Sequence, residues 1–461
     1  MPRPRPAVPA SVRFRILLRL GTLLLVAAAG GAAAPAPARA QSMKEALGQL
    51  FVFSEGNDPL FLAGSAGFPT TQVHGDHFIP SATVANASVL DFFIESISRN
   101  VSSFPIPTTV ASETFVFVNG VPTPTSSSFG PISAERAQTL GRGRLSAGLT
   151  YTRLGFQRIR GVDLRDIGLT FVHQNVDFPG CDEAFGDDCS RYGVPALEND
   201  RIDLALDLNI NAEVVALYTT YGLTDWLDLG VAVPVIGLEM IGSSRATIAP
   251  FGGGPVAHFF GGTPTDPVLT ARSQSHAQTT GIGDVAVRLK ARFARGPTWQ
   301  VAVLGEVRAP TGRQEDFLGT GSWNATGLFI ISGDLSGFSP HANLGYGYRG
   351  SRLDQDAFRA NLGFDDRLAD WVTLAADVLG VFKVGERTLV LPQAVTFDAP
   401  FRRTIPLTNI PDRRDDTIDG AFGFKFRAAP GLVVIANALV PLNEGGLRAG
   451  VVPTLGIEYS H

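Results

Sequence analysis

Charged side chains recur at alternate positions along several apolar stretches of this sequence. In residues 281–312, Arg288 and Lys290 alternate with Val287 and Leu289, so that one face of an extended chain is charged and the other apolar. The signs nearly balance over all such stretches, which favours cross-strand ion pairs over a pore selective for one sign of ion. Twelve charged residues are predicted to face the lumen of the β-barrel that is inferred below: Asp203, Asp207, Glu213, Asp284, Arg288, Lys290, Arg292, Glu306, Arg308, Arg359, Lys425 and Arg427.

The sequence contains no motif that would support catalysis. A nucleophile elbow, an HExxH pair and a phosphate-binding glycine loop are all missing, so we expect neither an enzyme nor a cofactor. His74 and His77 lack a third ligand nearby, and no metal is expected there. Cys181 and Cys189 are the only cysteines and close a short loop, which predicts a disulfide in an oxidising compartment.

The loop between these cysteines is acidic. Its sequence, CDEAFGDDC, carries four carboxylates whose oxygens would suit a divalent cation such as Ca²⁺. The spacing is not that of an EF-hand, so a solvated acidic loop is the preferred interpretation, and the calcium site remains the alternative.

The charged faces require strands to position them. Residues 281–312 read as two strands joined by the turn ARGPT, and each arm reaches the 9–11 residues that cross a membrane. The predicted fold is all-β and membrane-embedded: an antiparallel transmembrane β-barrel of about 12 strands in residues 144–461, preceded by a mixed helical and irregular, plug-like segment. A wall of fourteen strands is the alternative, in which residues 162–174 and a partner strand are part of the barrel. The predicted strands are 144–157, 201–221, 225–241, 281–295, 298–311, 321–335, 339–350, 356–367, 370–384, 416–428, 431–442 and 447–460.

The N-terminus predicts export. Residues 1–40 carry six Arg and no acid, then an apolar run and Ala38-Arg39-Ala40, the pattern of a secretory signal peptide. Its removal leaves 32 basic against 43 acidic side chains, which argues against a nucleic-acid partner. After residue 41 no apolar stretch has the length of a membrane-spanning helix. Together with the strands, this predicts the bacterial outer membrane, with its lipid as one partner.

Residues 41–143 do not show the alternation of a barrel. Ser42 and Glu45 form a capping box for a short helix through Leu50, and 88–100 have a helical apolar face. The segment TFVFVNGVP predicts a hairpin with Asn119-Gly120 at its turn. The segment is too apolar for a disordered tail. We expect a plug inside the barrel, with a small periplasmic domain as the alternative.

Four segments carry a resemblance to a known family. ALYTTYGLTDWLDLGVAVP, GIGDVAVRLKARF, RAPTGRQEDFLGTGS and HANLGYGY resemble motifs of the outer-membrane barrel family named for the meta pathway of phenol degradation, similar in outline to long-chain fatty-acid channels. The resemblance covers about 140–461 and implies a channel for passive uptake of small hydrophobic or aromatic compounds. The hundred residues before the barrel exceed what we expect of the family.

Apolar positions predicted on the inner face agree with a hydrophobic solute: Val215, Leu217, Leu328 and Ile330. The alternative function is a structural or adhesive outer-membrane barrel without transport. The sequence specifies neither the solute nor the oligomeric state.

Overall fold

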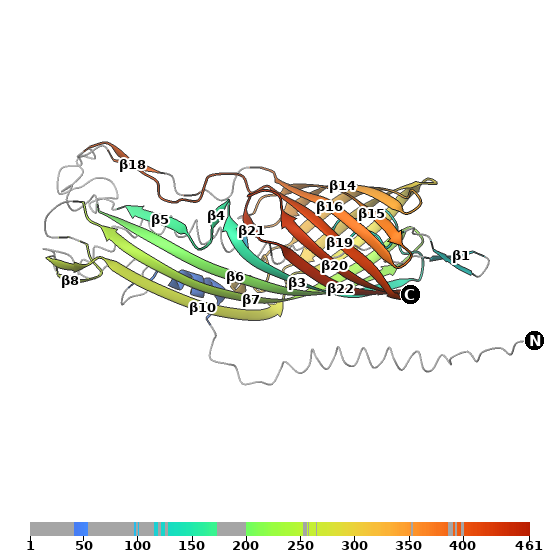
Figure 1. The fold of residues 1–461 in the computed structure, drawn as a ribbon, viewed down its shortest axis with the longest axis horizontal. Coiled ribbons are helices and arrows are strands. Elements are labelled where there is room, and N and C mark those ends of the chain that lie inside the picture. The colour runs from blue at the N-terminus through green and yellow to red at the C-terminus, as the bar shows by residue number, and fades with distance from the viewer. Residues whose placement is uncertain are drawn as a thin grey trace, which may run out of the picture. The chain divides into compact units, whose positions relative to one another are not determined.

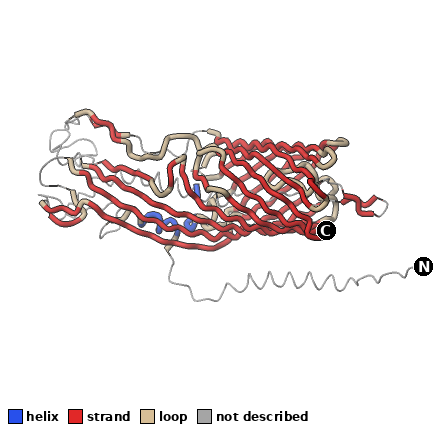
Figure 2. The backbone as a smooth tube through the Cα atoms, in the orientation of Figure 1, coloured by secondary structure: helices blue, strands red, loops and turns tan. Residues whose placement is uncertain are grey.

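Long antiparallel strands dominate the computed structural model, as the strand-coloured trace of Figure 2 shows. The structure describes residues 41–53, 96–97, 100, 115–118, 121–124, 128–172, 200–251, 256, 258–263, 265–351, 354–385, 391, 394–397 and 401–461. Residues Ser42–His461 form one compact unit. No helix among these described residues is long and apolar enough to cross a membrane.

Twelve of the described strands close into an antiparallel barrel (Figure 1). Each pairs with the next along the chain, and the ring closes where β22 pairs with β3, β3 with β6, β6 with β7 and β7 with β11. The wall strands are β3 (Leu145–Ile159), β6 (Arg201–Gly222), β7 (Leu227–Ala249), β11 (Val285–Arg295), β12 (Trp299–Ala309), β13 (Asn324–Gly333), β14 (Phe338–Arg349), β15 (Ala357–Ala369), β16 (Val372–Lys383), β19 (Thr417–Ala429), β20 (Leu432–Pro441) and β22 (Val452–Ser460).

The predicted barrel of about 12 strands is therefore confirmed, and each of the twelve predicted ranges overlaps one wall strand. Alternation together with turn residues was sufficient, because each hairpin has one apolar face and a short connection at one end. The stretch considered for a fourteen-stranded wall instead forms β4 (Val162–Asp163), which pairs with β3, and β5 (Ile167–Val172), which pairs with the start of β6.

Strands β6 and β7 continue beyond the closed barrel. At about 3.3 Å per residue, the 22 residues of β6 span roughly 70 Å, well over the ~30 Å of a bilayer core. Strand β10 (Thr270–Ile282), which the sequence did not predict, pairs with the outer part of β7, and β5 flanks β6. In Figure 1 these four strands run on together past the other wall strands. We call this four-stranded sheet the extension.

Short elements complete the described fold. Strand β21 (Leu447–Ala449) pairs with β3, and a 3₁₀ turn, η2 (Gln314–Asp316), lies between β12 and β13. Three small hairpins are β1 (Phe115–Val118) with β2 (Val121–Pro124), β8 (Gly261–Thr263) with β9 (Asp266–Val268), and β17 (Val395–Phe397) with β18 (Arg403–Ile405). The pairing of Val118 with Val121 confirms the predicted Asn119-Gly120 hairpin.

Helix α2 (Met43–Gln49) packs against the extension. Ser42 and Glu45 form the predicted capping box, in which the Glu45 amide donates to Ser42 Oγ at 3.2 Å and the Ser42 amide to Glu45 Oε2 at 2.9 Å. The helix buries Met43, Ala46 and Leu47 in one apolar cluster with the even-numbered side chains of β6. The predicted helix 88–100 falls mostly outside the described residues; positions 96, 97 and 100 are helical.

The outer face of the barrel is apolar. Large aliphatic and aromatic side chains stand exposed at alternate positions around the wall, with Leu362 66 % and Phe329 47 % exposed, while their neighbours in sequence face inward. Trp226, Trp299 and Trp371 are exposed beside the short turns, where an interfacial aromatic girdle belongs. A closed barrel with this surface spans a membrane, because water would oppose such exposure.

Candidate functional site

An irregular segment occupies part of the barrel interior. Residues 128–140, which we call the strap, contain no helix or strand, and every one of them except Ser133 is buried. Its partners run from β19 and β16 at its start, through β14 and β13, to β7 at its end. The strap thus follows the inner wall across eight of the barrel's twelve strands, from β19 to β7.

Polar side chains of the wall satisfy the strap's backbone. Asn343 is bonded to Glu135 twice: its Oδ1 accepts from the Glu135 amide at 2.8 Å, and its Nδ2 donates to the Glu135 carbonyl at 2.8 Å. Asp377 accepts from the amides of Ser133 and Ala134 at 3.2 and 3.3 Å. Asp228 accepts from the Leu140 amide at 3.0 Å. These contacts replace the secondary-structure hydrogen bonds that a buried irregular backbone lacks.

Charges hold the strap as well. Lys290 Nζ lies 3.5 Å from Glu135 Oε2 and 3.4 Å from the Arg136 carbonyl. Arg136 in turn forms a fully buried ion pair with Asp365 at 3.4 Å. Removing one partner of such a buried pair leaves an uncompensated charge and is strongly destabilising. At the start of the strap, the Arg427 guanidinium lies 5.0 Å from the centre of the Phe129 ring.

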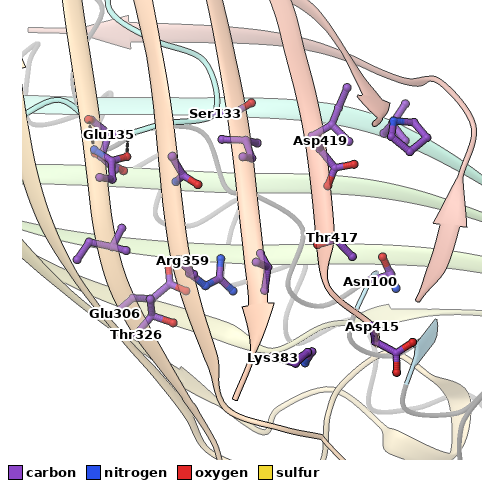
Figure 3. Close-up of a pocket in the computed structure, with 18 of the residues that line it drawn as sticks. Asn100, Ser133, Glu135, Glu306, Thr326, Arg359, Lys383, Asp415, Thr417 and Asp419 are labelled. Carbon is purple, nitrogen blue, oxygen red and sulfur yellow. Dashed lines mark hydrogen bonds between the residues drawn. The ribbon is translucent and has the colours of Figure 1, made fainter. Parts of the chain in front are cut away.

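A cavity of about 210 Å³ lies beside the strap, inside the barrel (Figure 3). Ser133 and Glu135 of the strap contribute to its lining, together with Asn100, Asp415 just before β19, and residues of the wall strands and β21. One group of its lining residues is charged, including Arg288, Glu306, Arg308 and Arg359. A second group is apolar: Leu154, Leu304, Leu328, Leu379, Val381, Leu439, Pro441, Leu447, Ala449 and Val452.

Most of the charged residues that line this cavity form ion pairs. Glu306 accepts from Arg288 Nε at 2.5 Å and from Arg308 Nε at 2.7 Å, so one carboxylate joins β11 and β12. The register sets this contact, because Arg288 and Glu306 are directly opposite in the β11–β12 ladder. Arg448 pairs with Asp419, and Lys383 pairs with Asp354.

The structure places six of the twelve residues predicted on the lumen-facing side beside the cavity or against the strap. Arg288, Glu306, Arg308 and Arg359 line the cavity, and Lys290 and Lys425 are buried against the strap. Three others lie apart from the cavity. Asp284 is buried and accepts from Gly312 and Thr320 of the β12–β13 loop, Arg292 donates to the Asp225 carbonyl at 2.8 Å, and Arg427 is exposed beside Phe129.

The assignment of Asp203, Asp207 and Glu213 to the lumen is wrong. All three lie on the face of β6 opposite the apolar cluster that includes helix α2. The inner positions of β6 are the even-numbered ones along its whole length, so Val215 and Leu217 also face outward. Of the predicted apolar inner positions, Leu328 lines the cavity and Ile330 is buried beside the strap's Ala137.

The error has a physical cause. In the extension the outer face is polar and the inner face is covered by α2, whereas in the barrel the outer face is apolar. The polarity of β6 therefore inverts near residue 214, although its period of two continues. The sequence carries the signal, since apolar residues occupy even positions up to Val214 and odd positions at Val215 and Leu217.

Sequence reasoning missed the residues that hold the strap. Asn343, Asp365 and Arg136 were not singled out, because their significance depends on a contact between segments more than 200 residues apart. The predicted Cys181–Cys189 disulfide, the acidic loop between these cysteines, His74 and His77, and the signal peptide in 1–40 all lie outside the described residues. Within the described part, no group of three or more His, Cys, Asp or Glu side chains is arranged to hold a metal ion.

A family model matches the middle of the chain. Residues 204–377, less than half of the sequence, match the family described as "Putative MetA-pathway of phenol degradation". The match confirms the resemblance. Matched residues include most of β6 and part of β16, so they cover much of the wall that lines the cavity. No curated protein matches the chain.

Several solved outer-membrane proteins are similar to the chain at low identity. An outer membrane channel from Pseudomonas putida F1 is 12 % identical, with 70 % of this chain and 98 % of that chain covered and a TM-score of 0.39. The P. putida toluene transporter TodX is 9 % identical, with coverages of 69 % and 89 % and a TM-score of 0.31. A Pseudomonas aeruginosa FadL homologue is 11 % identical, with the same coverages and TM-score as TodX.

The strand pairing itself defines the fold. Closed antiparallel barrels with a lipid-facing apolar belt are characteristic of the bacterial outer membrane, and that is where this protein resides.

Proposed function

We propose that this protein is an outer-membrane channel for the passive uptake of small hydrophobic or aromatic compounds. The observation that carries the proposal is the cavity inside the closed barrel, whose lining combines many apolar side chains with ion-paired charged ones. A channel for ions or sugars would not need a wall of leucine and valine. The family match supports the same function, since its description concerns the degradation of phenol, a small aromatic compound.

Residues 41–143 complete the proposal as a plug. Support comes from the strap, whose buried backbone is bonded to the wall and which contributes Ser133 and Glu135 to the cavity. Passage of a solute then requires the strap to move or the solute to pass beside it. A separate periplasmic domain would not need the wall's side chains as hydrogen-bond partners.

Flux into proteoliposomes tests the function. Phenol and benzyl alcohol should enter vesicles containing the protein faster than protein-free vesicles. Leu328→Trp should reduce the flux several-fold, because Leu328 lines the cavity and the larger ring would narrow it. Phe329→Trp is the matched control, because Phe329 is adjacent to Leu328 in sequence but is 47 % exposed on the outer face. No flux for any apolar solute, combined with loop-dependent binding to cells or surfaces, would instead identify an adhesive barrel.

A further inference from the structure

Basic side chains outnumber acidic ones on one side of the cavity. Strands β11, β12, β14, β15 and β16 contribute five basic residues to its lining, and Glu135 and Glu306 are the two carboxylates on that side. Asp354, in the connection between β14 and β15, pairs with Lys383 and lies 3.6 Å from Arg349. Counting Asp354, five cations therefore face three anions. The five basic residues are Arg288, Arg308, Arg349, Arg359 and Lys383.

Arg359 stands apart within this group. Arg288 and Arg308 bind Glu306, and Lys383 binds Asp354, whereas in the described part of the chain no hydrogen bond or ion pair engages the Arg359 guanidinium. In Figure 3 its side chain extends into the cavity from β15. A guanidinium inside a barrel without an anionic partner is unfavourable by itself, so the site has unused capacity for an anion.

The neighbouring strand leaves space beside this guanidinium. Gly347 is on the inner face of β14, two residues beyond Gly345, which is directly opposite Arg359 in the ladder. A Cβ at Gly347 would lie 3.6 Å from Arg359 Nε and 3.5 Å from Thr326 Oγ1, so a guanidinium donor and a hydroxyl flank the same spot. A side chain at position 347 would extend into this space and obstruct the approach to Arg359.

Apolar side chains are found on both sides of β15, which carries this guanidinium. Val381 is directly opposite Arg359 in the β15–β16 ladder, and Leu328 is paired with Gly345 in the β13–β14 ladder. Both line the cavity. A ligand that fills this space meets one cationic donor group and an apolar wall together.

We propose that the cavity binds a solute that joins a small apolar or aromatic body to a carboxylate, with the carboxylate paired to Arg359. The planar fork of a guanidinium matches the two oxygens of a carboxylate, which gives orientation as well as attraction. The leucine and valine side chains would contact the hydrocarbon part. This inference rests on the proposed uptake function and narrows its substrate class to amphipathic monoanions.

Binding to the full chain, purified in detergent at pH 7, tests the inference by calorimetry. The probes are benzoate, benzyl alcohol without the charge, acetate without the apolar body, and inorganic phosphate. Benzoate should bind at least tenfold more tightly than each of the other three. Arg359→Gln should weaken benzoate binding by about ten- to a hundredfold, the range for losing a charge-assisted hydrogen-bond pair, and should affect benzyl alcohol binding much less, because that solute has no carboxylate.

Two further variants separate the charge of Arg359 from general effects on folding. Arg359→Lys keeps the charge but loses the fork, so it should recover part of the benzoate affinity. Arg367 lies near the short-turn end of the same strand, and its side chain is 42 % exposed. The Arg367→Gln variant should therefore bind benzoate as the wild type does. Heat-modifiable gel mobility confirms that each variant is folded.

The inference is overturned if phosphate binds as tightly as benzoate, if benzoate and benzyl alcohol bind equally, or if Arg359→Gln behaves as Arg367→Gln does. Measuring benzyl alcohol flux in proteoliposomes distinguishes failure of the carboxylate site from failure of the proposed uptake function. Persistent flux without a benzoate preference removes only the carboxylate site, whereas absence of flux for both solutes removes the channel as well.

Discussion

Replacing Asn343 by alanine should release the strap from the barrel wall. The Asn343 side chain is buried and forms two hydrogen bonds of 2.8 Å with the backbone of Glu135, one as acceptor and one as donor. The strap has no secondary structure, so these bonds have no replacement within the strap itself. Asn343→Ala removes both of these hydrogen bonds from a buried backbone amide and a buried carbonyl.

The expected size follows from these two groups. Leaving one buried polar group unsatisfied costs about 1–3 kcal/mol, so two groups weaken docking of the strap by roughly 2–4 kcal/mol once water enters the space left by the side chain. Each 1.4 kcal/mol is about a tenfold change in an equilibrium constant, so the undocked population should rise about thirty- to several-hundredfold. Single-channel recording in planar bilayers measures this as a higher frequency of open events.

Asn361→Ala provides a matched control. Asn361 is directly opposite Asn343 in the β14–β15 ladder and lines the same cavity, but among the described residues its side chain forms no hydrogen bond with the strap. Its open frequency should stay within about threefold of the wild type. If folded Asn343→Ala records the same open frequency as Asn361→Ala, the strap does not control conductance, and the reasoning from its hydrogen bonds is refuted.

Three further predictions concern the plug and the wall. Deleting 42–140 while keeping the signal should raise single-channel conductance; unchanged conductance in a folded deletion would mean that the segment does not occlude the lumen. Gly345→Ala should lower the free energy of unfolding in urea by about 1–3 kcal/mol, because the added Cβ would clash with the Gly327 carbonyl oxygen. Gly327→Ala should be neutral, because its Cβ would have no atom within 4 Å. Leu362 is 66 % exposed on the lipid face, so Leu362→Arg should lower the free energy of unfolding of the barrel in vesicles by about 2–4 kcal/mol. Leu442 lies just beyond the end of β20, and Leu442→Arg should lower it by under about 1 kcal/mol. Equal effects of the two substitutions would contradict the assigned lipid-facing belt.

Much of the wall could be predicted from local pattern alone. In residues 281–312, Arg288 and Lys290 alternate with Val287 and Leu289 in both sequence and structure, because a transmembrane strand needs one face for lipid and one for the interior. The capping box at Ser42 was equally local, since its partner is three residues away. Strand β10 escaped prediction because its sequence TARSQSHAQTTGI has no apolar face, and it is held by its pairing with β7.

The sequence by itself predicted a wall of about twelve strands, the hairpin order and the presence of charges on the inner wall, since each depends on residues close together in the chain. Only the tertiary structure decided which face of β6 is inside, because that depends on the helix that covers it and on where the membrane ends. The same holds for the strap and the cavity. Glu135 meets Asn343, and Arg359 extends beside Gly347, only once the barrel has closed, because the free energy of each contact comes from burial that no local segment can provide.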